Sequence, residues 1–132
     1  MAPAAADVIA AHFQDTGLPT DYYDLILTGD LGKIGSEICA ELLVYNGLQI
    51  SNIYSDCGVM IYDIDKQDAH AGGSGCGCSA TVFAGYIYNQ LQTGKLKRIL
   101  FIPTGALLSP VSVQQGETIP CIAHAVAIQS VL

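Results

Sequence analysis

The sequence predicts an α/β fold, in which helices pack against a mixed sheet of about five strands. Short apolar runs bounded by glycine or proline recur along the chain, as is typical of buried parallel strands. Between them lie longer segments whose apolar residues repeat with the period of a helix. The expected order is α-β-α-β-α-β-β, and we expect residues 1–132 to form a single domain.

The first three elements follow from their boundaries. Residues 3–15 are predicted to form a helix, because Pro3 suits a first helical turn and Gly17 suits a helix end. Residues 24–29 are an apolar run that predicts a buried strand. The next helix is expected over residues 33–46. Its apolar face is expected to consist of Ile34, Ile38, Leu42 and Tyr45.

The remaining elements follow from the same patterns. Residues 59–62 are a candidate strand, and residues 76–91 are predicted to form a helix. Residues 98–102 are a strong strand candidate. A long turn is expected over residues 105–117, followed by a last buried strand within residues 119–131.

The composition indicates a partner. Hydrophobic residues make up 51% of the chain and charged residues only 13%, whereas a small monomer needs polar side chains to cover its surface. We therefore expect one face to be covered, and we expect the isolated chain to form a homodimer.

Charge and hydropathy exclude other classes. The formal net charge of -7 argues against nucleic acid as a partner. No run of 18 uncharged apolar residues occurs, so no membrane-spanning segment is predicted, and the first residues are typical of a helix start rather than of a secretory leader. The five irregularly spaced cysteines predict a reducing compartment.

A glycine-rich loop, residues 70–80, stands out as the candidate site. Ten of its eleven residues are small, so its backbone amides are exposed and neighbouring backbone can approach closely. Ahead of a helix, such a loop favours a carboxylate, a phosphate or a thiolate. It is equally consistent with a tight backbone crossing, and both interpretations stay open at this point.

Three side chains are candidates for chemistry. His70 could act as a general base or as a hydrogen-bond donor, or be an ordinary loop residue. Cys76 could be a nucleophile near a helix N-terminus or a packing residue. Asp30 follows a predicted buried strand, where it could bind a ligand or cap the next helix. Cys76 and Cys78 could form half of a metal site with His70 or Cys57, but they lack a second cysteine pair, so no metal is expected. No cofactor is expected either.

Four blocks of the sequence carry a resemblance to a known family. Residues 23–33, 70–80, 94–98 and 104–125 resemble the C-terminal portion of the stage V sporulation protein AD family of spore-forming Firmicutes. That family is similar to the thiolase and ketoacyl synthase superfamily, whose subunit consists of two α/β halves. The resemblance implies that this chain is most of the second half, with the N-terminal half absent.

The resemblance also bears on catalysis. Asp30 stands where ketoacyl synthases carry a histidine, and residues 102–106 contain no cysteine where thiolases carry one. The loop that begins at His70 is similar to a thiolase histidine loop. Condensing activity is therefore not expected. The alternative is an acyltransferase acting on a thioester, with His70 as general base and Cys76, or a cysteine of the first half, as nucleophile.

The resemblance implies a binding role in spore formation. It implies that the protein binds dipicolinic acid or its calcium chelate, supports its uptake into the developing spore, and acts with membrane subunits as a peripheral protein at the spore inner membrane. The N-terminal half would complete the pocket. The residues expected to line it in this chain are Asp30, His70, Gly73, Ser74, Gly75, Cys76, Thr104, Gly105 and Ala106.

Overall fold

The computed structural model describes residues 1–131 and contains a mixed four-stranded sheet with the strand order β2-β1-β3-β6. Strand β1 (Leu25–Thr28) runs parallel to β2 (Tyr54–Asp56) and to β3 (Arg98–Ile102). Strand β6 (Val126–Gln129) pairs with β3 in the antiparallel direction. The predicted α/β class with a mixed sheet is therefore confirmed, and the main sheet has four strands.

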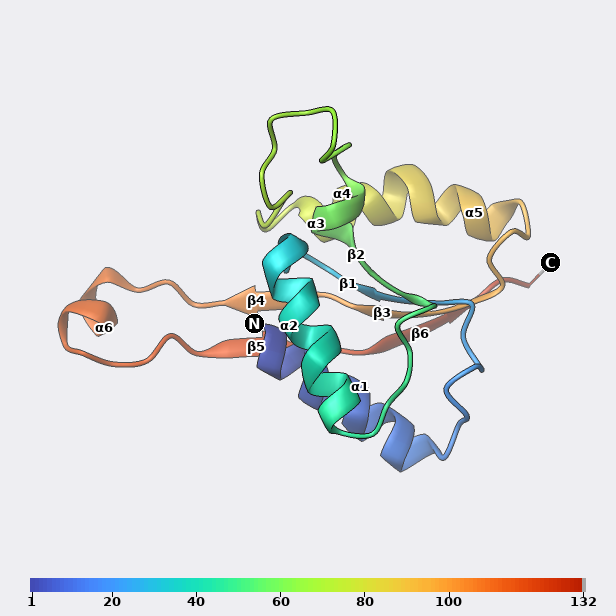
Figure 1. Cartoon of the computed structure of the whole chain (residues 1–132), viewed down its shortest axis with the longest axis horizontal. Helices are drawn as coiled ribbons and strands as arrows, with labels where there is room; N and C mark the ends of the chain where they lie inside the picture. Colours follow the sequence, from blue (N-terminus) through green and yellow to red (C-terminus); the bar gives the residue numbers. More distant parts are fainter. Residues whose placement is uncertain (132) are drawn as a thin grey trace.

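Helices cover both faces of the sheet (Figure 1). Helices α1 (Ala2–Thr16) and α2 (Gly32–Tyr45) lie on one face, and the helical segment 78–92 lies on the other. Alternate residues of β1 serve the two layers, since Ile26 packs in the cluster beneath α1 and α2 whereas Leu27 packs in the cluster beneath the segment 78–92. The buried strands thus read as continuous apolar runs.

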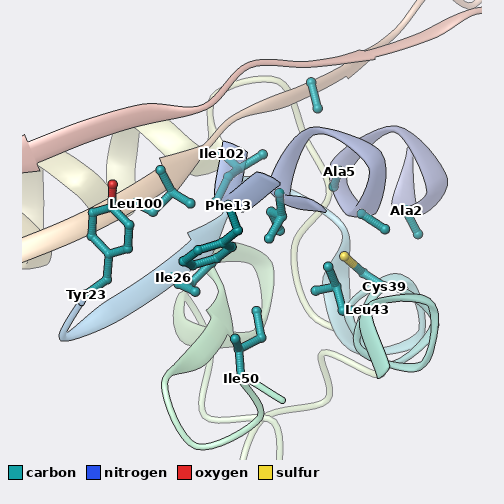
Figure 2. Close-up of a cluster of buried hydrophobic side chains, with 13 residues drawn as sticks. Ala2, Ala5, Phe13, Tyr23, Ile26, Cys39, Leu43, Ile50, Leu100 and Ile102 are labelled. Atoms are coloured by element: carbon teal, nitrogen blue, oxygen red, sulfur yellow. The ribbon is translucent and has the colours of Figure 1, made fainter. Parts of the chain in front are cut away.

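The core between α1, α2 and the sheet contains many small side chains (Figure 2). Ala5 and Ala6 of α1 and Cys39 of α2 are fully or almost fully buried there, beside the larger Ile9 and Leu43. Small side chains at a helix contact allow the two axes to approach closely. This explains why α1, rich in alanine, packs against α2.

The expected apolar face of α2 is wrong at three of its four residues, whereas Leu42 does pack against the core. Ile34, Ile38 and Tyr45 are exposed by 64%, 45% and 90%, whereas Cys39 and Leu43 are completely buried. The helix is therefore rotated so that Cys39 and Leu43 face α1 and the sheet. Packing against α1 decides this rotation, and local periodicity alone does not encode it.

The strand expected over residues 59–62 is also wrong. Residues Cys57–Met60 form a short helix, α3, and the strand β2 lies just before it. The carboxylate of Asp56 accepts a hydrogen bond of 2.8 Å from the backbone N–H of Gly58 and so caps α3. This cap ends the strand and starts the helix.

The helix expected over residues 76–91 is confirmed in position. It consists of α4 (Cys78–Val82), a π-helical turn η1 (Phe83–Ile87) and α5 (Tyr88–Gln92), which follow one another directly. Across the described residues, none of the helices has the length and apolar character needed to cross a bilayer.

The chain beyond β3 forms a long protruding hairpin, which we call the arm (residues 104–123). Strands β4 (Thr104–Ala106) and β5 (Cys121–Ala123) pair in the antiparallel direction, and the short helix α6 (Pro110–Gln114) lies at the tip. Figure 1 shows the arm extending away from the body of the protein. The long turn expected over residues 105–117 thus contains the helix α6. The single strand expected within residues 119–131 is two strands, β5 and β6.

Candidate functional site

The three parallel strands end at one edge of the sheet, and polar side chains follow each of them. Asp30 follows β1, Asp56 is the last residue of β2, and Thr104 comes shortly after β3. The carboxyl ends of parallel strands are where open α/β sheets bind ligands. This edge is therefore the candidate site.

Asp30 is the centre of this edge. Its side chain is only 6% exposed, and Thr104 donates a hydrogen bond from Oγ1 to Oδ1 of Asp30. The hydroxyl of Ser74, in the glycine-rich loop, donates to the backbone oxygen of Asp30 over 2.8 Å. The structure therefore brings three of the predicted site residues together, from segments 44 and 74 positions apart.

Gly29 allows this close approach. A Cβ atom at residue 29 would lie 3.0 Å from Cα of Pro103, 3.1 Å from Cβ of Ser79 and 3.3 Å from the backbone nitrogen of Thr104. These contacts are tighter than ordinary packing, so a larger residue would separate the segments. Glycine at this position lets the ends of β1 and β3 and the start of α4 meet.

Asp56 organises the backbone behind the site. Its Oδ2 accepts hydrogen bonds from Thr28 Oγ1 at 2.7 Å and from the N–H of Leu31 at 3.0 Å. Its Oδ1 accepts from the N–H groups of Gly32 at 2.9 Å and Gly58 at 2.8 Å. Four donors thus satisfy one buried carboxylate, as a buried charged group requires.

The hydrogen-bond network extends from Asp56 into the core. The hydroxyl of Tyr54 lies 3.0 Å from Oγ1 of Thr28 and is hydrogen-bonded to the thiol of Cys39. Burial raises the pKa of Asp56, and the four hydrogen bonds oppose that rise. Burial likewise raises the pKa of Tyr54 and of Cys39, so both stay protonated at neutral pH.

The glycine-rich loop forms a tight backbone crossing. The N–H of Gly73 donates to the oxygen of Gly58 over 2.7 Å, and the N–H of Lys33 donates to the oxygen of Ala71 over 2.7 Å. A Cβ atom on Gly58 would overlap the oxygen of Gly73, and one on Gly32 would lie 2.8 Å from the oxygen of Ala71. Of the two interpretations left open by the sequence, the crossing is the one that these contacts describe.

The other predicted site residues lie around this crossing. His70 has a positive φ of 47°, and its exposed ring lies 3.4 Å from a carboxylate oxygen of Asp68. Within the described residues, the polar contact of His70 is thus with Asp68 and not with Asp30. Gly75 and Cys76 are exposed beside the start of α4. Gly105 and Ala106 belong to β4, where they pair with Ile122 and Cys121.

Asp56 is the site residue that the sequence reasoning missed. The signal was present, because an aspartate two residues before Gly58 and separated by one residue from an apolar pair, Ile53 and Tyr54, is typical of a strand end that caps a helix. Within the described residues, no group of three or more His, Cys, Asp or Glu is placed to hold a metal ion. The oxygen donors of the site are Asp30, Ser74 and Thr104.

The fold and this edge define an α/β protein with an oxygen-lined candidate binding site at the ends of its parallel strands. A family model described as Stage V sporulation protein AD (SpoVAD) matches residues 1–129. The chain is also 52% identical over 129 residues to Stage V sporulation protein AD of Bacillus subtilis (strain 168). That match covers 98% of this chain and 38% of the relative's length. The chain belongs to the stage V sporulation protein AD family, which supports a role in sporulation.

Proposed function

We propose that this chain contributes the C-terminal part of a thiolase-like protein that binds dipicolinic acid, as its calcium chelate, and supports its uptake into the developing spore. The observation that carries the proposal is the convergence of Ser74 and Thr104 on Asp30 at the carboxyl edge of the sheet. Family membership supplies the biological setting.

The charge of the site favours the chelate over free dipicolinate. Dipicolinate is a dianion, and Asp30 together with a net charge of -7 would repel it. A one-to-one complex with Ca²⁺ is neutral, and carboxylate and hydroxyl oxygens are the ligands that Ca²⁺ prefers. The residues we assign to the site are Asp30, Ser74 and Thr104, with the glycine-rich loop and the first residues of β4 around them.

The rest of the pocket would come from outside this chain. The chain spans 38% of the length of the curated relative, so a larger protein has room for a second half that closes over the carboxyl edge. We further propose a homodimer that acts peripherally at the spore inner membrane with membrane subunits. The apolar composition of the chain, with only 13% charged residues, supports the expectation that partners cover part of its surface.

Calorimetric titration of the full-length protein that contains this chain tests the proposal. Dipicolinate is titrated with and without Ca²⁺ into the unmodified protein, Asp30→Asn and Thr104→Val. Thr118→Val is the matched control, because Thr118 is exposed on the arm. Saturable binding that needs Ca²⁺ and is weakened at residues 30 and 104, but not at residue 118, supports the proposal.

Two other results of this titration would change the proposal. Binding that is lost in His70→Ala but kept in Thr104→Val would move the site to the exposed rim of the loop. The absence of heat with either form of the ligand would contradict a binding role. In that case turnover of acyl-CoA, compared between the unmodified protein and Cys76→Ser, would test the acyltransferase alternative.

A further inference from the structure

A second pocket lies at the opposite end of the sheet from the candidate site. It has a cavity volume of about 280 Å³ and is formed by α1, the loop that follows it, the start of β3 and the end of β6. The rings of His12, Tyr22 and Tyr23 line it together with Arg98, Leu18 and Ile128. Figure 1 shows the amino ends of β1 and β3 at the end of the molecule away from the arm, so this pocket is separate from the carboxyl edge.

Arg98, in the wall of this pocket, has hydrogen-bond donors without a partner. Its Cζ atom lies 4.4 Å from the centroid of the Tyr22 ring, so a cation–π contact holds the planar guanidinium. Among the described residues, no carboxylate lies within ion-pair distance of this guanidinium, and no acceptor is hydrogen-bonded to it. The carboxylate of Asp24 accepts instead from the backbone N–H groups of Lys97 and Arg98, at 2.7 and 2.8 Å. A held guanidinium with free N–H groups is suited to binding a carboxylate through two parallel hydrogen bonds.

His12 and Tyr23 supply a further donor to the pocket. Nε2 of His12 lies 2.8 Å from the hydroxyl oxygen of Tyr23. Burial lowers the pKa of His12, against the opposing effect of Asp15, and burial raises the pKa of Tyr23, so the imidazole is neutral and the phenol is protonated at pH 7. The pair then has one ring N–H and one O–H, and the shared hydrogen bond uses one of them. One donor is left over whichever ring nitrogen carries the proton.

Charge also distinguishes this pocket from the candidate site. Lys95, Lys97 and Arg98 are three of the five basic side chains of the chain, and all three lie within residues 95–98, at the start of β3. The carboxyl edge of the sheet carries Asp30 and Asp56 instead. An anion is therefore better accommodated at the amino end of β3 than at the carboxyl edge.

The lining of the pocket favours a small aromatic carboxylate. Aromatic walls favour a flat ring, which can stack or pack edge-to-face against them. A pocket of about 280 Å³ is at the lower end of the range for small-molecule sites, so it suits a single ring rather than a nucleotide. We propose that this pocket is a second ligand site, which binds an aromatic monocarboxylate with its carboxylate on Arg98. All the side chains that this site needs belong to the described part of the chain.

Titration with benzoate tests the site, with binding followed by ligand-detected NMR. The protein is the full-length protein that contains this chain, and neither Ca²⁺ nor dipicolinate is present. We expect saturable binding with a Kd of about 1 mM, as for a ligand of this size. Arg98→Gln should weaken binding by about tenfold or more, because the charge-assisted hydrogen bonds are lost. Lys97→Gln is the matched control, since it removes the same charge from an exposed neighbour that does not line the pocket, and it should change the Kd by less than about twofold.

A second pair of variants tests the shape of the pocket without changing its charge. Ala127→Leu adds a larger side chain to the wall formed by β6 and should abolish the binding of benzoate. Val126→Leu, at the adjacent residue of β6 outside the lining, should leave the binding unchanged. Benzamide has the same ring without the charge and should bind about tenfold more weakly than benzoate. Circular dichroism of all variants establishes that they are folded.

Four results would overturn the inference. The absence of saturable benzoate binding would exclude the site, whether or not the rest of the full-length protein fills the pocket. Equal losses in Arg98→Gln and Lys97→Gln would assign the binding to general charge. Equal affinities for benzamide and benzoate would remove the role of the carboxylate. Loss of binding in Thr104→Val but not in Arg98→Gln would place benzoate at the carboxyl edge. None of these measurements uses dipicolinate or Ca²⁺, so this inference and the proposed function can fail separately.

Discussion

Thr28 and Asp56 join the carboxyl ends of β1 and β2 through a hydrogen bond of 2.7 Å. Because Asp56 also holds the N–H groups of Leu31 and Gly32, it fixes the turn that directly follows Asp30. The candidate site thus depends on a carboxylate that lies behind it. This arrangement leads to the first prediction.

Asp56→Asn should lower the free energy of unfolding by about 1–3 kcal/mol, because a side-chain amide would direct an N–H toward the N–H of Leu31 and leave both without an acceptor. Urea denaturation followed by circular dichroism measures the loss. Asp7→Asn is the control, since Asp7 is exposed on α1. Equal stability of the two variants would contradict the role assigned to Asp56.

Two aspartates should give the stability opposite dependences on pH. Burial raises the pKa of Asp56 above its ordinary value of 3.8, so the folded state binds its proton more tightly than the unfolded state does. The part of the stability that is linked to the proton of Asp56 is then fully present below pH 3.8 and is lost as the pH rises through the raised pKa. Asp56→Asn should abolish this decrease.

Asp24 should behave in the opposite way. Burial by itself would raise its pKa, but the N–H groups of Arg98 and Lys97, at 2.8 and 2.7 Å, outweigh burial and hold the pKa below 3.8. Its stabilising contribution is present above pH 3.8 and is lost as the pH falls through the lowered pKa. The free energy of unfolding of Asp24→Asn, Asp56→Asn and the unmodified chain is therefore compared across about pH 2.5 to 7. Asp56→Asn should differ in its pH dependence at the acidic end, and Asp24→Asn should differ from the unmodified chain at the neutral end. Parallel curves would show that the two carboxylates titrate alike.

Gly58→Ala should destabilise the backbone crossing by about 1–3 kcal/mol or more, because the added methyl group would overlap the oxygen of Gly73. Gly77→Ala is the matched control, since a Cβ atom there meets nothing within 4 Å. The control should change stability by less than about 0.5 kcal/mol. Chemical denaturation of both variants makes the comparison, and similar losses at both positions would argue against the crossing.

The five thiols should divide into two classes of reactivity. Cys76 and Cys121 are exposed, whereas Cys39, Cys57 and Cys78 are buried. Burial raises the pKa of Cys57 to about 12, which leaves almost no thiolate at pH 8. Iodoacetamide should modify two thiols of the native chain quickly and the other three only after unfolding. Mass spectrometry of labelled peptides identifies them, and early labelling of Cys57 would mean that this core opens readily.

Local signals predicted the elements that are decided locally. The strands at residues 25–28 and 98–102 follow from apolar runs with clear ends, and α1 follows from Pro3 and Gly17. Strand β2 was missed because it has only three residues and is defined by its parallel pairing with β1, in which Tyr54 lies opposite Ile26. Pairing with a strand that is distant in sequence leaves no hydrophobic periodicity within β2 that could be detected.

The site was partly predictable for a similar reason. Asp30 was identifiable from its place after an apolar strand, and the resemblance to the sporulation family indicated Ser74 and Thr104, all three of which meet in the structure. The position of His70 beside Asp68 follows from a left-handed backbone conformation, which an isolated histidine in a loop does not signal. The residue types thus identified the candidate site residues. Which of these residues meet is decided by the way three segments of the chain cross.

The central pairing of the sheet has a consequence for how the chain folds. Strands β1 and β3 are neighbours, although Leu25 and Ile99 are 74 positions apart, whereas β3 and β6 are joined by the arm. The entropy cost of closing the longer loop must be met before the parallel pair forms, so chains with such pairings fold slowly. A ribosome must therefore release β3 before β1 can pair with it, and until then the edge of β1 opposite β2 stays open to other chains.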